Sequence, residues 1–119
     1  MSGDDIDELF SSFGAVDVRR MFGGAGIYAE GVMFALAHDG MLYLKADAQS
    51  QPAFEREGQG AFSYVRKGGK RAVMSYWCVP DRLYDDPDEL ARWARVALAA
   101  AQRSRADAGR AAARKRRVR

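Results

Sequence analysis

The sequence predicts an α+β protein: a single antiparallel sheet of five to six strands with three helices packed on one side. Three observations support this fold class. Apolar runs separated by short glycine-containing turns fill most of residues 16–79, which is typical of hairpin-connected strands. A short apolar pattern at helical spacing precedes these runs, and a longer one follows them. Strands grouped together with helices outside the group favour α+β over an alternating α/β order.

The first predicted helix covers residues 4–13. Its apolar residues recur at helical spacing and form one face: Ile6, Leu9, Phe10 and Phe13. Four strands should follow, at about residues 16–22, 26–29, 32–37 and 41–45. Glu30-Gly31 and Asp39-Gly40 are the predicted hairpin turns, because Asp-Gly favours the tight turns that join antiparallel strands.

Strict alternation along the third strand places Val32, Phe34 and Leu36 on one face. In the fourth strand the same rule separates two leucines from Tyr43 and Lys45. The sheet should therefore bury one face under helices and leave the other in contact with water.

The second half of the chain predicts a helix, a hairpin and a longer helix. The second helix is predicted at residues 50–57, with Ser50 as its N-cap. Strands at about 61–66 and 71–79 flank a two-glycine turn, and the second of them should lie centrally, because it is apolar on both faces. The last helix should run from 87 to about 103. Asp86, Pro87 and Glu89 provide its capping signals, and its apolar stripe comprises Leu90, Trp93, Ala94, Ala97, Leu98 and Ala101.

Charge divides the chain into a domain at residues 1–103 and a basic tail at 104–119. The tail holds seven arginines and lysines against one aspartate, a net charge of +6. The whole chain carries +3, so residues 1–103 carry −3. The tail has no apolar face, and this composition predicts disorder.

The composition also bears on where the protein works. No apolar run reaches the ~18 residues that a membrane span needs. The acidic N-terminus does not resemble a secretory signal, and the lone Cys78 cannot form an internal disulfide. We therefore expect a cytoplasmic protein without membrane contact.

Neither Cys78 nor the single histidine suggests catalysis. His38 lies beside a turn and should be exposed, and Cys78 lies in an apolar strand and should be a buried, inert thiol. We expect no catalytic residues, no metal site and no cofactor.

Two groups of side chains are candidate partner contacts. Tyr43 and Lys45 should share the open side of the sheet, with Tyr28 beside them. They can stack bases, cover a half-exposed sheet or form a dimer contact, and we favour the last two. The second group is a basic hairpin, which is either a contact surface or only solvated: Arg66, Lys67, Lys70 and Arg71.

The tail is a candidate for weak, non-specific attraction to nucleic acid. Flexible cations bind phosphate backbones without sequence preference, and the alternative is a solubilising extension without a partner. The residues concerned are Arg110, Arg114, Lys115, Arg116 and Arg117.

Ordered motifs cover most of the chain. They are Arg20-Met21-Phe22-Gly23-Gly24, Gly31-Val32-Met33-Phe34-Ala35-Leu36, Leu42-Tyr43-Leu44-Lys45, Phe62-Ser63-Tyr64, Met74-Ser75-Tyr76-Trp77-Cys78-Val79-Pro80, and Asp86-Pro87 with Leu90 and Trp93. Together they resemble the TfoX N-terminal domain family, named after bacterial regulators of competence genes. Those regulators usually carry a second, C-terminal domain, so this chain resembles a stand-alone N-terminal domain.

The resemblance implies a non-enzymatic regulatory or interaction module. Such a module would assist transcription regulation through contacts with a protein partner, such as the transcription machinery, and it could form a homodimer. The alternative is a small-molecule-binding domain or an enzyme that uses the open face of the sheet, although the residues supply no evident acid, base, nucleophile or metal constellation.

Overall fold

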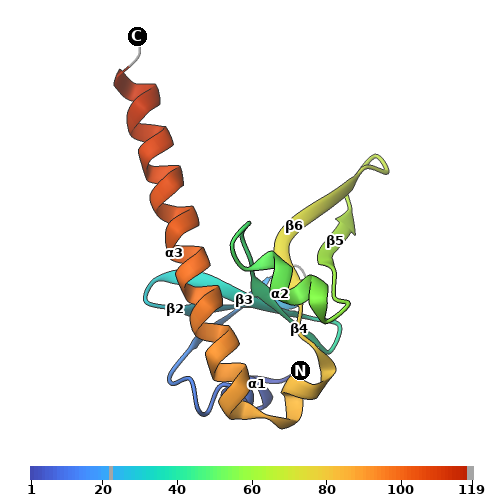
Figure 1. Ribbon diagram of the computed structural model, residues 1–119. Coiled ribbons are helices and arrows are strands. Elements are labelled where there is room, and N and C mark those ends of the chain that lie inside the picture. The colour runs from blue at the N-terminus through green and yellow to red at the C-terminus, as the bar shows by residue number, and fades with distance from the viewer. Residues whose placement is uncertain (22, 118–119) are drawn as a thin grey trace.

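The computed structural model describes residues 1–21 and 23–117. Within them, six strands form one antiparallel sheet in the order β1-β2-β3-β4-β6-β5 (Figure 1). The strands are β1 (Asp17–Met21), β2 (Gly24–Ala29), β3 (Val32–His38), β4 (Met41–Lys45), β5 (Ala61–Val65) and β6 (Arg71–Cys78). The helices are α1 (Gly3–Leu9), α2 (Gln51–Arg56), a 3-10 helix η1 (Asp81–Asp85) and α3 (Pro87–Arg117). The predicted fold class is confirmed.

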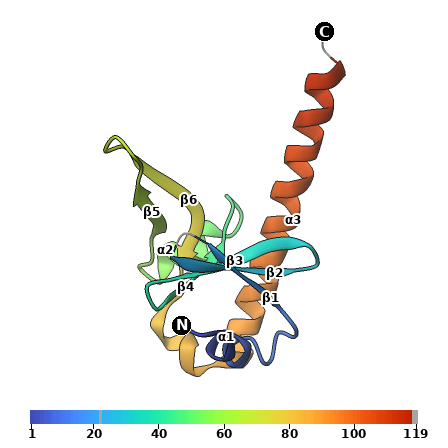
Figure 2. The same cartoon turned by 180° about the vertical axis from the view of Figure 1, so that it is seen from behind.

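The core lies between the sheet and the three α-helices, which pack on the same side of it (Figures 1 and 2). Phe10, in the turn that follows α1, meets Phe34 of β3 edge to face, with ring centroids 5.5 Å apart. Phe54 of α2 lies 5.0 Å from Trp93 of α3. Leu42 of β4 is fully buried on the same side of the sheet. Burial of these side chains in one cluster holds both layers together.

Strand β3 contains a bulge, and this corrects one expectation. Ile27 pairs with Ala35 while the next residue of β2, Tyr28, pairs with Met33, so Phe34 is one extra residue on β3. Phe34 and Ala35 consequently both contribute to the core. Leu36 does not share a face with Phe34 as strict alternation predicted, because the extra residue turns it to the opposite side.

The predicted turns before and after β3 are confirmed. Glu30 and Gly31 have φ values of 51° and 78°, and Asp39 and Gly40 have 53° and 75°. Both pairs therefore occupy the left-handed region that tight hairpin turns require. Gly24 plays a different part in β2, because a Cβ atom there would collide with the backbone carbonyl oxygen of Ala37 on β3.

Helix α3 begins with the predicted cap but does not end near residue 103. The carboxylate of Asp86 accepts a hydrogen bond from the backbone N–H of Glu89, with N···O 3.1 Å. The apolar stripe is buried from Leu90 to Ala101, apart from the half-buried Trp93. The helix then continues to Arg117. Residues 104–112 are exposed, and this end of the helix projects beyond the sheet (Figure 1).

The helical end replaces the predicted disorder for a reason that the sequence contains. Alanine and arginine are strong helix formers, and a helix that is already docked needs only propagation, without the unfavourable nucleation step. Gly109 is the weak position in this segment. The division into a domain at 1–103 and a basic tail stays a prediction.

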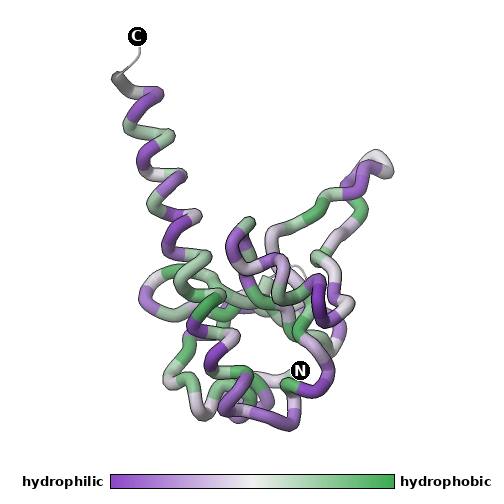
Figure 3. The backbone as a smooth tube through the Cα atoms, in the orientation of Figure 1, coloured by the Kyte–Doolittle hydropathy of each residue, from purple (hydrophilic) through white to green (hydrophobic). Residues whose placement is uncertain are grey.

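The β5–β6 hairpin projects from the sheet on the side opposite the hydrophobic core (Figures 1 and 2). Strand β6 lies between β4 and β5, as its apolar character predicted, but its first half is outside the core, and Val73 is 69% exposed. Figure 3 shows hydrophilic residues beside the hairpin tip, and hydrophilic residues alternating with weakly hydrophobic ones along the projecting end of α3.

Candidate functional site

One face of the sheet lies opposite the helices. It carries Tyr28 of β2, Met33 and Leu36 of β3, Tyr43 of β4, and Tyr76 and Cys78 of β6. We call it the open face. Leu36 pairs with Tyr43, and Tyr43 pairs with Cys78, so these side chains form one row across three strands.

The structure places Tyr28, Tyr43 and Lys45 together on the open face, as alternation predicted. The guanidinium carbon of Arg19 lies over the ring of Tyr28, 4.8 Å from its centroid. The ring of Tyr43 meets that of Phe62 edge to face at 5.0 Å. The rings are therefore engaged by neighbouring side chains, and their role in binding stays a prediction.

Lys45 is tied to strand β6. Its Nζ donates a hydrogen bond to Ser75 Oγ at 2.5 Å and lies 5.3 Å from the centroid of the Tyr76 ring. Burial lowers the pKa of Lys45, while the nearby Asp47 acts in the opposite direction. Lys45 is thus a partly desolvated cation at the margin of the open face.

An apolar pocket lies where the β5–β6 hairpin rises from the open face. Its volume is about 220 Å³. Three methionines, one from each of β1, β3 and β6, surround it: Met21, Met33 and Met74. Leu36, Phe62, Tyr64 and His38 complete most of its lining. We call it the methionine pocket, and its thioether side chains are polarisable and adapt readily to different shapes.

Alternation and composition did not predict this pocket. Met74 and Val73 are adjacent in β6, so their side chains face opposite sides of the sheet. This alternation could have indicated that one of them lies on the open face. Strict alternation places Leu36 on the face of Phe34, but the bulge in β3 turns it toward the pocket. Phe62 and Tyr64 follow strict alternation along β5 and both line the pocket, whereas Met74 lies in the stretch of β6 where the pairing with β5 shifts register.

A second depression continues the open face toward α3. It has a volume of about 330 Å³ and is more open. Met33 lines both depressions, and Tyr76 and Lys45 border the second together with Ser104 and Arg105 of α3. Arg105 also donates to the backbone carbonyl of Gly31, with N···O 3.1 Å. The two depressions therefore form one trough between the hairpin and α3, which we call the open-face trough.

The predicted basic hairpin forms the tip of the arm above the methionine pocket. Arg66, Lys67, Lys70 and Arg71 are all exposed there. Arg71 donates a hydrogen bond to Ser63 Oγ at 2.7 Å, which braces the base of the tip. The hairpin tip does not adjoin Lys45. The two predicted contact groups, the basic tip and the open-face group that includes Lys45, therefore lie in different parts of the same trough.

The predicted nucleic-acid contacts lie on the projecting end of α3. Arg114 and Lys115 are exposed there, and Arg110 pairs with Asp107 of the same helix. The side chains of Arg116 and Arg117 lie outside the described residues. The end of α3 therefore presents its cations on a helix rather than on a flexible tail.

His38 and Cys78 are both half-buried, unlike either expectation. The ring of His38 meets Phe62 at 5.2 Å, so it belongs to the wall of the methionine pocket rather than to an exposed turn. Burial raises the pKa of the Cys78 thiol, with Asp81 adding to the effect. A protonated thiol is a poor nucleophile.

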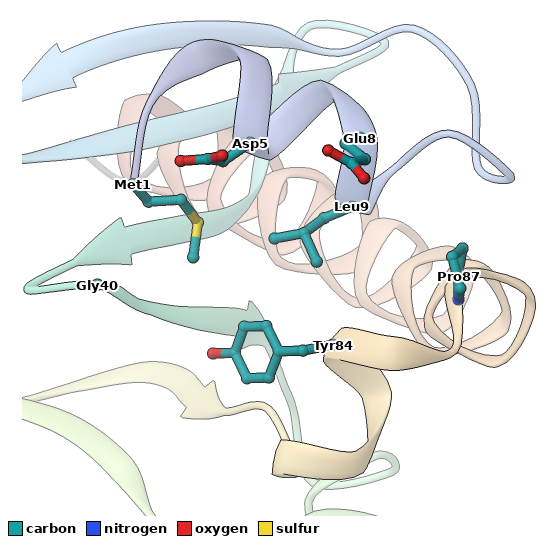
Figure 4. A pocket seen from close by; sticks show the side chains of 7 residues that line it. All are labelled: Met1, Asp5, Glu8, Leu9, Gly40, Tyr84 and Pro87. Carbon is teal, nitrogen blue, oxygen red and sulfur yellow. The ribbon is translucent and has the colours of Figure 1, made fainter.

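A shallow depression of about 370 Å³ lies between α1, the turn at Gly40 and η1 (Figure 4). Asp5 lies at its edge, but its carboxylate accepts a hydrogen bond from the backbone N–H of Ser2, which lowers the pKa of Asp5. The acid thus serves to cap α1. Within residues 1–21 and 23–117, no three His, Cys, Asp or Glu side chains come together to hold a metal ion.

Comparison with known protein families identifies the family of this chain. The model of the TfoX N-terminal domain family matches residues 8–101. The chain belongs to the TfoX N-terminal domain family. All residues that line the methionine pocket fall inside the matched range, whereas the projecting end of α3 lies beyond it.

Two curated relatives are similar to this TfoX N-terminal domain. DNA transformation protein TfoX1 of Aliivibrio fischeri is 33% identical over 89 residues, which is 71% of this chain and 42% of TfoX1. Protein Sxy of Escherichia coli is 28% identical over 94 residues, which is 79% of this chain and 44% of Sxy. The chain thus spans less than half the length of these relatives.

In the described part of the chain, no helix combines the length and the apolar character needed to cross a bilayer.

Proposed function

We propose that this chain is a non-enzymatic regulatory module that acts in the cytoplasm and assists the transcription of genes for DNA uptake through contacts with a protein partner. The observation that carries the proposal is membership of the TfoX N-terminal domain family, together with similarity to a protein named for DNA transformation. The open-face trough is the surface best suited to the contact, because it combines an apolar pocket with exposed cations.

The projecting end of α3 adds a second, weaker attraction in this proposal. Arg110, Arg114 and Lys115 lie on a helix that extends beyond the sheet, where they can approach a phosphate backbone. Such contacts carry no sequence information, and they weaken as salt rises. They would hold the module near DNA while the open face meets the partner.

Deletion of the gene in its own cell tests the regulatory role. Transcripts of the DNA-uptake genes and the frequency of transformation should fall, and expression of the full chain from a plasmid should restore both. A control plasmid should carry Trp93→Ala, which weakens the docking of α3 and is expected to restore less. Unchanged transcripts in the deletion strain, under conditions where the wild-type chain is expressed, would overturn the proposal.

The second candidate is binding of a small molecule, and the methionine pocket is the observation that favours it. The pocket is apolar and partly enclosed by the hairpin. A thermal-shift screen over nucleotides and metabolites separates the candidates. A stabilising compound whose effect disappears in Met74→Gln would favour the small-molecule function.

A further inference from the structure

The open-face trough has a deep apolar end and basic walls. The methionine pocket forms the deep end, the hairpin tip stands above it, and the end of α3 stands on the opposite side (Figure 1). These features are independent of one another in the sequence, and the fold brings them to one side of the sheet. If the chain acts as the regulatory module proposed above, these features together should recognise its protein partner.

The size of the pocket favours a side chain over a metabolite. Sites for drug-sized ligands usually enclose about 300–1,000 Å³. The methionine pocket, at about 220 Å³, suits one or two large apolar side chains. Met33 and Met74 line it from strands that do not pair with each other, so a residue inserted there would contact two parts of the sheet.

The walls favour an acidic partner. The tip residues 66–71 contain four cations and no acid, and all four are exposed. On the side of α3, the exposed Arg105 lines the second depression. Exposed cations around an apolar pocket are electrostatically complementary to carboxylates that flank an apolar anchor.

The aromatic side chains argue against single-stranded nucleic acid as the occupant of this pocket. Base stacking needs a free ring face. Tyr43 and Phe62 instead meet edge to face, at an interplanar angle of 68°, and Arg19 covers Tyr28. The pocket itself is lined mainly by apolar atoms, which offer few partners to the polar edges of a base.

We propose that the open-face trough binds an acidic segment of the partner protein, which inserts one or two large apolar side chains into the methionine pocket. The carboxylates that flank the anchor then lie against the hairpin tip and beside Arg105 of α3. Affinity comes from burial of the anchor, and the charges contribute orientation and the rate of association.

Methyl spectra of methionine test where the segment binds. The full chain is prepared with carbon-13 methyl methionine and titrated with synthetic peptides in which Asp and Glu flank a single Phe, Leu or Trp. Met21, Met33 and Met74 should shift together, whereas Met1 and Met41 lie outside the pocket and serve as internal controls. Peptides with Ala at the anchor should shift none of them.

Two adjacent residues of β6 supply matched variants. Met74 lines the pocket, and Val73 is 69% exposed on the opposite face of the same strand. Met74→Gln should weaken binding of the peptide by about tenfold or more, whereas Val73→Gln should leave the affinity unchanged. Replacing Arg66 and Lys70 by Glu should slow association and remove most of its salt dependence.

Several outcomes would overturn the inference: no methionine shift with any acidic peptide, equal shifts with uncharged peptides, or shifts of the same methionines by an oligothymidine. Failure here remains distinct from failure of the regulatory role. Loss of uptake transcripts in the deletion strain without peptide binding would leave that role intact and remove the open-face trough as its site. Peptide binding without any change in transcripts would support the trough as a peptide-binding site and overturn the regulatory role.

Discussion

The phenol of Tyr76 donates a hydrogen bond to the backbone carbonyl of Met33, with O···O 3.0 Å, across the intervening strand β4. Tyr76 is 8% exposed, and burial raises its pKa to about 12, with Tyr28 adding to the effect. The hydrogen bond links two strands that do not pair with each other. It therefore fixes the floor of the open-face trough, where Met33 separates the two depressions.

Ionisation of Tyr76 should destabilise the fold at alkaline pH. The pKa in the folded state, about 12, lies above the value of about 10 for an unfolded tyrosine. The folded state therefore retains the proton longer, so the stabilisation is complete below pH ~10 and is lost as the pH rises toward ~12. Denaturant titrations of the wild type between pH 8 and pH ~12 should show this decline.

Two variants isolate the contribution of Tyr76. In Tyr76→Phe the loss of the hydrogen bond should cost about 1 kcal/mol near neutral pH, and the alkaline decline should become shallower. Tyr64→Phe is the matched control, because Tyr64 is 44% exposed and should change neither quantity. An alkaline decline of equal slope in wild type and Tyr76→Phe would contradict the assignment.

Gly24→Ala should prevent stable folding. Its Cβ atom would collide with the carbonyl oxygen of Ala37, and this oxygen belongs to the backbone of a central strand and cannot move away cheaply. Gly60→Ala is the control, because no atom lies within 4 Å of a Cβ built at Gly60. We expect a cooperative thermal transition in Gly60→Ala and a strongly lowered or absent one in Gly24→Ala. Similar melting curves for the two variants would refute the close approach of β2 and β3.

Trp93→Ala should destabilise the protein by about 3 kcal/mol, the lower end of the range for deletion of a large aromatic, because Trp93 is half-buried. The indole packs on Phe54, and its Nε1 donates to Glu89 at 3.2 Å. Val96→Ala, at a 51% exposed position of the same helix, should cost little. Chemical denaturation measures both, and an unchanged midpoint in Trp93→Ala would mean that α3 is not docked through this residue.

The projecting end of α3 should attract duplex DNA weakly and lose that attraction steeply with salt. Replacing Arg110, Arg114 and Lys115 by Gln should lower the slope of log K against log salt by about 0.9 for each phosphate contact removed. Gly109→Pro keeps every charge but breaks the helix, so it separates charge from conformation. Salt-insensitive binding that survives the three substitutions would move the DNA contact to another surface.

Much of the fold could be predicted, because its signals are local. The cap at Asp86, the turns at Asp39-Gly40 and Glu30-Gly31, and the stripe from Leu90 to Ala101 each depend on neighbouring residues, and each is found as expected. Helix α3 is longer than predicted, because lack of an apolar face does not prevent a segment from being helical. Helix propensity and a docked first half suffice for a helical end.

The candidate site was harder to predict, because it depends on two irregularities of the sheet. The extra residue Phe34 reverses the face of Leu36, and Met74 lies where the pairing of β6 with β5 shifts register. Leu36 and Met74 both line the methionine pocket. Periodicity alone cannot show where alternation is interrupted, since an inserted apolar residue looks like any other apolar residue of the strand.

The bulge in β3 also determines where the chain can change its length. Phe34 is the surplus residue, so its deletion would leave Met33 and Leu36 on the open face and Ala35 and Ala37 in the core. Deletion of Leu36 instead would shift every following residue to the opposite face. Loss of Phe34 would remove a buried ring but preserve the sheet. Single-residue gaps among homologous sequences should therefore be tolerated at the bulge, at Phe34 or the adjacent Ala35, better than elsewhere in β3.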